Sequence, residues 1–209
     1  MASFINAERH GWRRCARAGA LVAWVALGVG CSGGPKAEPG IGPFDPPAEQ
    51  LAFEFDGREW TPGFQKREGR LSTEIYVLPG ETPKEWTELV TRVLTLGGQR
   101  GANMDGLVKL KKATLEKDCP IVTFETLALE RRSALYEWSR PQCKDQGPQT
   151  EIGRFVFGRL GIHLVTYTAK TSRVAPGLRR QWVEALRNAK LTLDEPGSAG
   201  DSATAPDPN

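Results

Sequence analysis

The fold is decided by one stretch of the chain, Glu151-Ile152-Gly153-Arg154-Phe155-Val156-Phe157-Gly158-Arg159-Leu160-Gly161-Ile162-His163-Leu164-Val165-Thr166-Tyr167-Thr168. Its two halves, Glu151 to Phe157 and Ile162 to Thr168, are rich in β-branched and aromatic residues. They flank the turn sequence Gly158-Arg159-Leu160-Gly161, and this arrangement is typical of a β-hairpin. The stretch therefore predicts two antiparallel strands joined by a short turn.

A second hairpin is predicted upstream, between Ile121 to Glu130 and Ala134 to Ser139, with its turn at Arg131-Arg132. In this register Phe124 faces Trp138 and Leu127 faces Leu135, which suits cross-strand packing. The same register sets two acidic residues, Glu125 and Glu137, opposite each other.

Two cysteines, Cys119 and Cys143, lie symmetrically about the turn at Arg131 and so meet at the open end of this hairpin. An even pair of cysteines in an exported protein suggests a disulfide, and closing such a loop contributes roughly 3 kcal/mol. The alternatives are a catalytic thiol or metal ligands. The pair has no C-x-x-C spacing, however, and two cysteines alone cannot complete a closed zinc site.

Helical spacing of apolar residues predicts a helix over Asn103 to Lys117 and another near Pro176 to Lys190, with Pro176 at its start. Lys111 falls on the apolar stripe of the first helix, where we expect its stem to lie on the core and its ammonium group to reach water.

The segments upstream of these helices are predicted as strands, with one ambiguity. Leu51 to Phe55 alternates apolar and polar residues, and Leu71 to Leu78 ends at Pro79-Gly80. From Thr82 a capping-box pattern and apolar residues at helical spacing favour a helix, whereas the β-branched residues within Thr87 to Leu96 leave a strand open. The order of elements predicts an α+β domain, with a largely antiparallel sheet and two or three packing helices.

The chain begins with a layout typical of a secretory signal. Arginines at 9, 13, 14 and 17 precede the apolar run Leu21 to Leu27, which leads to Gly28-Val29-Gly30-Cys31. With cysteine first in the mature chain, this resembles a bacterial lipoprotein precursor, although Gly28 stands where such precursors usually have leucine. The resemblance implies cleavage between Gly30 and Cys31, and a lipid anchor with fatty-acyl chains such as palmitate on Cys31. An uncleaved membrane anchor, an ordinary signal peptide and twin-arginine export are the alternatives.

This resemblance and the composition of the chain together imply a division of the chain into segments and a subcellular location. Residues 1–30 are the signal peptide, 31–50 the lipidated cysteine and a Gly/Pro-rich flexible tether, 51–193 a single domain, and 194–209 a disordered tail. The protein would be anchored in the cell envelope and face the periplasm. Aspartate after the cysteine often marks inner-membrane retention in enteric bacteria, so Ser32 favours the outer membrane.

The charge balance argues against a nucleic-acid partner. The chain holds 28 basic and 25 acidic residues, and removing the four arginines and one glutamate of residues 1–30 leaves 24 of each. A nucleic-acid partner would need a net basic face. The sequence also has no polybasic run that would hold an anionic membrane, which leaves membrane attachment to the lipid.

Three side chains are candidates for chemistry: His163, Glu125 and Glu137. His163 is the one histidine of the mature chain, and two facing carboxylates can serve as acid and base in glycoside hydrolysis. A Gly-x-Ser-x-Gly motif, a phosphate-binding glycine loop and metal-ligand spacing are all missing from the sequence. We therefore expect no metal and no cofactor, and His163 as a sheet-surface or satisfied core histidine. For the two glutamates we expect either a register that is off by one residue, so that they do not face each other, or neutralisation by a nearby Arg or Lys.

Several segments resemble uncharacterised exported proteins of Gram-negative bacteria. They are Tyr76 to Thr82, Trp86 to Thr91, Tyr136 to Trp138 with Cys143, and Glu151 to Arg154 with His163. The order of elements is also similar to the Mog1/PsbP-like fold, which often serves as a non-catalytic accessory or binding module. Neither resemblance assigns a role to any residue.

Two hypotheses follow. The first is a lipid-anchored envelope protein with a non-catalytic binding or scaffolding role and a possible envelope protein partner. The second is a small periplasmic hydrolase that uses the carboxylate pair or His163. A cleft joining these side chains would favour the second hypothesis.

Overall fold

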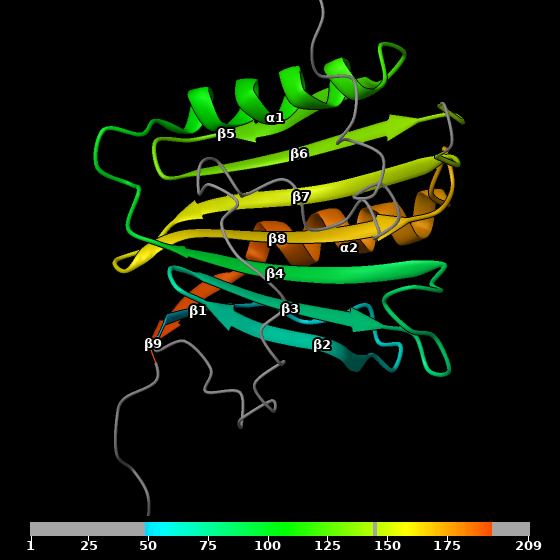
Figure 1. The fold of residues 1–209 in the computed structure, drawn as a ribbon, viewed down its shortest axis with the longest axis horizontal. Helices are drawn as coiled ribbons and strands as arrows, with labels where there is room; N and C mark the ends of the chain where they lie inside the picture. The colour runs from blue at the N-terminus through cyan, green and yellow to red at the C-terminus, as the bar shows by residue number, and fades with distance from the viewer. Residues whose placement is uncertain (1–48, 144–145, 194–209) are drawn as a thin grey trace, which may run out of the picture. The chain divides into compact units, whose positions relative to one another are not determined.

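The structure is a computed structural model that describes residues 49–143 and 146–193 of the 209-residue chain (Figure 1). All described elements belong to one compact unit of the chain. These elements form an antiparallel sheet of seven strands, a two-stranded ribbon and two helices. The predicted α+β class with a largely antiparallel sheet is confirmed.

The seven strands lie side by side in an order that differs from their order in the chain. That order is β2 (Thr61–Glu68), β3 (Leu71–Val77), β4 (Glu88–Leu96), β8 (Gly161–Ala169), β7 (Gln149–Phe157), β6 (Ser133–Arg140) and β5 (Thr123–Leu129). The ribbon pairs β1 (Glu49–Ala52) with β9 (Lys190–Leu193). Edge strand β2 contains Pro62 and a register shift between Pro62 and Phe64.

The two helices belong to different apolar clusters of the core. Helix α1 (Met104–Asp118) packs on β5 and β6, whereas α2 (Pro176–Asn188) packs on β7 and β6. Side chains of a strand point alternately to the two faces of the sheet. In β6, Tyr136 therefore joins the cluster of α1 and Leu135 joins the cluster of α2. Within the described residues, no helix is long and apolar enough to cross a membrane.

The hairpin predicted from Glu151 to Thr168 is confirmed, as strands β7 and β8 with residue-for-residue pairing from Phe157–Ile162 to Thr150–Ala169. Gly161 is required at the turn, because a Cβ there would clash with the carbonyl oxygen of Thr95. This close approach lets β4 lie directly against β8.

The second hairpin is confirmed with one error of register. Phe124 pairs with Trp138 as predicted, but Leu135 pairs with Ala128 and not with Leu127. A bulge between Thr126 and Ala128 is the cause, since a bulge adds one unpaired residue and shifts the register beyond it.

The ambiguous segment is a strand from Glu88 to Leu96, so the helix favoured by its local signals is wrong and the strand alternative is confirmed. Strand β4 lies between β3 and β8, where Val90 and Leu94 are buried on one face and Leu89 on the other. Burial on both faces places apolar residues at the adjacent positions Leu89-Val90 and Val93-Leu94, and this spacing resembles that of a helix. Strand β1 begins at Glu49, two residues before the expected start of the domain, and ends at Ala52.

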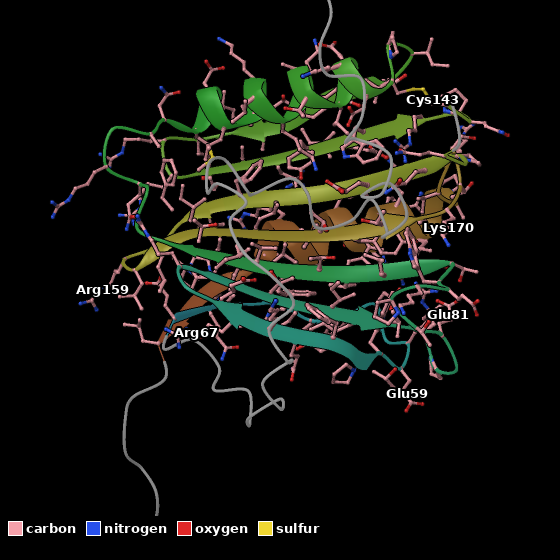
Figure 2. The ribbon with its side chains drawn as sticks, viewed as in Figure 1. Glu59, Arg67, Glu81, Cys143, Arg159 and Lys170 are labelled. Carbon is pink, nitrogen blue, oxygen red and sulfur yellow. A yellow bond between two sulfur atoms is a disulfide. The ribbon has the colours of Figure 1, made fainter. Side chains whose placement is uncertain are left out.

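Four connections meet at one end of the sheet: residues 69–70, 97–103, 130–132 and 158–160. Figure 2 shows Arg67 and Arg159 at this end, and Glu59 and Glu81 at the other. Glu49, the first described residue, also lies at this end, because its carboxylate accepts hydrogen bonds from the backbone amides of Arg159 and Leu160.

Candidate functional site

The predicted carboxylate pair exists but is tied to a cation. Glu125 and Glu137 pair across β5 and β6, and Glu125 is exposed. Arg179 of α2 donates from Nε to Glu137 over 2.7 Å. This hydrogen bond raises the pKa of Arg179, and the charges of both glutamates add to the shift. The arrangement is the expected neutralisation by a nearby cation, and helix α2 supplies that cation.

His163 is a buried histidine with a buried carboxylate partner. Its side chain is 4% exposed, and its Nε2 lies 2.7 Å from Oε1 of Glu49, whose side chain is 1% exposed. The other oxygen of Glu49 accepts from the amide of Arg159 over 2.7 Å. Glu49 thereby ties the ribbon to β8 and to the β7–β8 turn.

The surroundings of Glu49 favour its ionised form. Burial alone raises the pKa of this carboxyl, but the hydrogen bonds with His163 and with the amides of Arg159 and Leu160 outweigh burial, so the pKa of Glu49 is lowered overall. Because an ionised carboxylate only accepts hydrogen bonds, Nε2 of His163 carries the hydrogen in this pair.

Sequence reasoning assigned Glu49 to the tether and so missed it. One signal was present, because the apolar alternation Leu51, Phe53, Phe55 extended back by two residues places Glu49 on the buried face. A glutamate in a Gly/Pro-rich segment gave no local reason to extend the pattern that far.

A cavity of about 20 Å³ opens beside the Glu49–His163 pair, enough for a single water molecule. Ser72, Glu74 and Arg92 also line it. The buried Oγ of Ser72 has no hydrogen-bond partner among the described residues, whereas Arg92 donates to Glu74 over 3.2 Å. The cavity thus gathers a hydroxyl, an imidazole and two carboxylates.

These groups do not form a nucleophile–base pair. Ser72 pairs with Leu94, and Leu94 pairs with His163, so the side chain of Leu94 stands between the hydroxyl and the ring on the same face. A nucleophile and its base must lie within hydrogen-bond reach of each other. The cavity also admits a water molecule and nothing as large as a sugar or a peptide.

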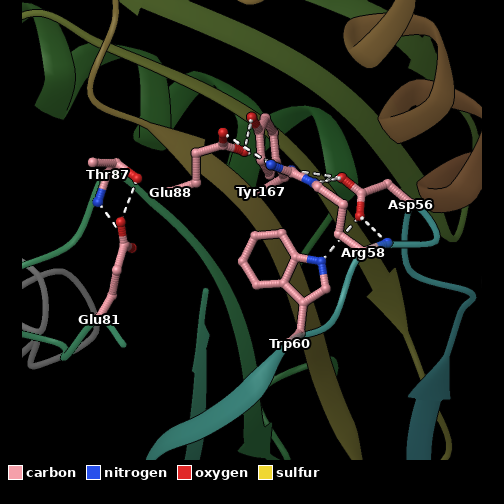
Figure 3. Close-up of polar contacts among 7 residues, drawn as sticks. All are labelled: Asp56, Arg58, Trp60, Glu81, Thr87, Glu88 and Tyr167. Atoms are coloured by element: carbon pink, nitrogen blue, oxygen red, sulfur yellow. Dashed lines mark hydrogen bonds and ion pairs between the residues drawn. The ribbon is translucent and has the colours of Figure 1, made fainter. Parts of the chain in front are cut away.

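A second polar cluster, which the sequence did not reveal, joins the β1–β2 connection to the sheet (Figure 3). Arg58 donates to both carboxylate oxygens of Glu88, over 3.1 and 2.6 Å, and over 2.7 Å to Asp56. Tyr167 donates to Glu88 over 2.6 Å, and Trp60 donates to Asp56 over 3.0 Å.

The charges of this cluster stabilise one another. The hydrogen bond with Glu88 raises the pKa of Arg58, and burial raises the pKa of Tyr167. Burial alone would raise the pKa of Asp56, but its hydrogen bonds with Arg58 and Trp60 lower it overall. The carboxylates of Asp56 and Glu88 each accept at least two hydrogen bonds. The cluster therefore fixes the β1–β2 connection to the sheet, and its carboxylates serve structural contacts and not catalysis.

Lys111 does not reach water as expected. Its Nζ lies 2.9 Å from Glu151 beneath α1, and its side chain is 14% exposed. Tyr136 donates to the same carboxylate over 2.8 Å. Glu151 lies on the face of β7 that the helix covers, so the lysine is an internal partner for a carboxylate.

The predicted disulfide between Cys119 and Cys143 is present, with Cα atoms 5.9 Å apart. It links the end of α1 to the segment that follows β6, and Cys119 is buried. Gly30 and Cys31, the predicted cleavage and lipidation residues, lie outside the described residues. Within residues 49–143 and 146–193, no three His, Cys, Asp or Glu side chains are grouped so as to hold a metal ion.

Comparison with known proteins assigns no family. No protein-family model matches the chain, and no curated protein sequence matches it. The lipoprotein, exported-protein and Mog1/PsbP-like resemblances therefore stay predictions from residues and from the order of elements.

Proposed function

We propose that this protein is a lipid-anchored component of the bacterial cell envelope that binds or scaffolds another envelope component without catalysing a reaction. The leader that ends at Gly30-Cys31 supports the anchor. The non-catalytic role is supported by one observation: the carboxylate pair lies apart from His163, and both Glu137 and His163 are held in structural contacts. Glu137 pairs with Arg179, His163 pairs with Glu49, and strand β7 separates β6 from β8.

The anchor is tested with Cys31→Ser in the full chain. We expect the wild-type protein to take up labelled palmitate and to fractionate with membranes. The variant should take up no label. A wild-type protein without label, or a variant that labels equally, contradicts the anchor.

The non-catalytic role is tested by complementing the phenotype of a deletion strain. Glu125→Gln, Glu137→Gln and His163→Gln should each restore the phenotype when the variant accumulates to wild-type levels. A folded His163→Gln protein that fails, beside a Glu59→Gln control that succeeds, contradicts the proposal.

The Glu49–His163 pair favours a second candidate, a small periplasmic hydrolase that uses His163. A buried carboxylate that orients a histidine is the arrangement of a general base. Loss of complementation by His163→Gln, with folding intact and the exposed Glu59→Gln control still active, would support this candidate over the first.

A further inference from the structure

Five arginines that are far apart in the sequence lie at one end of the sheet. They occupy the four connections described above and form what we call the basic end: Arg70, Arg100, Arg131, Arg132 and Arg159. All five are exposed, and none forms an ion pair with a carboxylate of the described residues. Chain-wide charge neutrality therefore conceals a local excess of positive charge.

The acidic residues near this end are engaged elsewhere. Glu68 pairs with Lys66 and Asp105 pairs with Lys109, over 3.0 and 2.7 Å. Glu130, the acidic residue within the four connections, accepts a hydrogen bond from Ser133. Even with the charge of Glu130 counted, the five arginines leave a net positive charge at the basic end for an external anion.

Exposed leucines accompany the arginines. Leu129 precedes the β5–β6 turn and is 49% exposed, and Leu160 lies in the β7–β8 turn and is 42% exposed. Basic residues mixed with exposed apolar side chains are typical of surfaces that rest at a lipid–water interface.

The chain reaches the domain at this same end. Glu49 lies against the amides of Arg159 and Leu160, and it follows Cys31 by 18 positions in the sequence. Even a fully extended chain of that length spans only about 60 Å. A lipid on Cys31 would thus hold the domain near a bilayer by its basic end.

We propose that the basic end docks on the anionic phospholipid headgroups of the membrane, so that the arginines orient the domain which the lipid anchors. This inference rests on the proposed lipid anchor. The occupant follows from charge complementarity and from the place where the chain enters. Residues 194–209 are the competing occupant, since they follow β9 and contain Asp194, Glu195, Asp201 and Asp207 without a basic residue. Four carboxylates spread over these residues give a lower density of negative charge than the surface of an anionic bilayer does.

The test is hydroxyl-radical footprinting of the full-length, lipid-modified protein on vesicles of phosphatidylcholine, with or without phosphatidylglycerol. Oxidation of Leu129 and Leu160 should fall at least about twofold on the anionic vesicles, because each arginine near an anionic surface raises the binding constant by a factor of about five. Leu110 and Ile121, which are 52% and 60% exposed and outside the basic end, are internal controls that should not change. The protection should disappear in about 1 M NaCl, where the Debye length is about 3 Å.

Two matched triple variants distinguish the effect of charge at the basic end from the effect of the net charge of the protein. The triple variant Arg100→Gln, Arg131→Gln, Arg159→Gln should lose the protection. It spares Arg70 and Arg132, which donate to backbone carbonyls and hold their turns. The control triple Lys84→Gln, Lys117→Gln, Arg173→Gln removes the same charge from exposed sites away from the basic end and should keep the protection.

Four results distinguish the docking from its alternatives, and three of them overturn it. Equal oxidation of the leucines on both vesicles, or equal loss in both triple variants, overturns the docking. If removal of residues 194–209 exposes the leucines on neutral vesicles and lipid charge has no effect, the tail is the occupant and the docking is wrong. A protein that washes off neutral vesicles yet binds anionic ones through its arginines contradicts the lipid anchor and supports the docking.

Discussion

Glu49 holds a negative charge inside the fold, where a carboxylate persists only if it is hydrogen-bonded. Its pKa is lowered on folding, so its contribution to stability is present above its ordinary pKa of about 4.3 and is lost as the pH falls through the lowered value. The free energy of unfolding should therefore decrease below about pH 4.3. Glu49→Gln should flatten that decrease and cost about 1–3 kcal/mol at neutral pH. Urea unfolding between pH 3 and pH 7 measures both, and exposed Glu59→Gln, as the control, should leave the curve unchanged.

Trp182 is fully buried at the centre of the aromatic cluster that joins α2 to the sheet. Its ring stacks on Tyr167 with centroids 4.5 Å apart and meets Trp60 and Phe55 edge to face. Trp182→Ala should cost about 3–5 kcal/mol in denaturant unfolding. Trp182→Phe should cost less, because the indole Nε1 has no partner among the described residues. Leu110→Ala, at an exposed site, should stay within about 0.5 kcal/mol, and an equal loss there would contradict this interpretation.

At the scale of elements, the disulfide fixes the end of α1 to the end of the β5–β6 hairpin. Cys119→Ser with Cys143→Ser should lower the free energy of unfolding by roughly 3 kcal/mol, through the loop that the bond closes. Non-reducing peptide mapping of the exported protein should recover one linked pair containing both cysteines. Free thiols at both positions would contradict the bond, and reducing agent should leave the stability of the double variant unchanged.

The elements that were predicted correctly from the sequence are those in which one apolar period or one turn sequence dominates. The β7–β8 hairpin, β3 and both helices each show one dominant period or turn, and their bounds fall within a few residues of prediction. Strand β4 was misleading because its two faces are both buried. Strands β2 and β9 were missed because nearly all their side chains are exposed, which removes any apolar alternation.

The candidate site was predictable only in part, for a related reason. The pairing of Glu125 with Glu137 follows from hairpin register, which is local. The partners that decide their chemistry, Arg179 and Glu49, come from residues 42 and 114 positions away from those they bind. No local pattern encodes contacts of that separation, and the basic end escaped detection in the same way because its arginines come from four separate connections.

At the scale of the whole molecule, the proposed lipid anchor predicts that the residue after Cys31 decides which membrane holds the protein. If Ser32 permits transfer to the outer membrane, Ser32→Asp should move the protein to the inner-membrane fraction of a sucrose gradient. Gly34→Asp adds the same charge two residues later and should leave the protein in the outer-membrane fraction. Equal distributions of the two variants would contradict this role of Ser32.

The irregularities of the two edge strands bear on how copies of the chain behave when crowded. An open sheet presents unpaired amides and carbonyls along its edge strands. Two flat edge strands from different copies can pair by hydrogen bonds and so cause aggregation. Here β2 has a proline, a register shift and the charged run Lys66-Arg67-Glu68, and β5 has the bulge at Leu127. Each edge strand is thus a poor template for another strand, so a protein concentrated on a surface can remain monodisperse and avoid polymerising edge to edge.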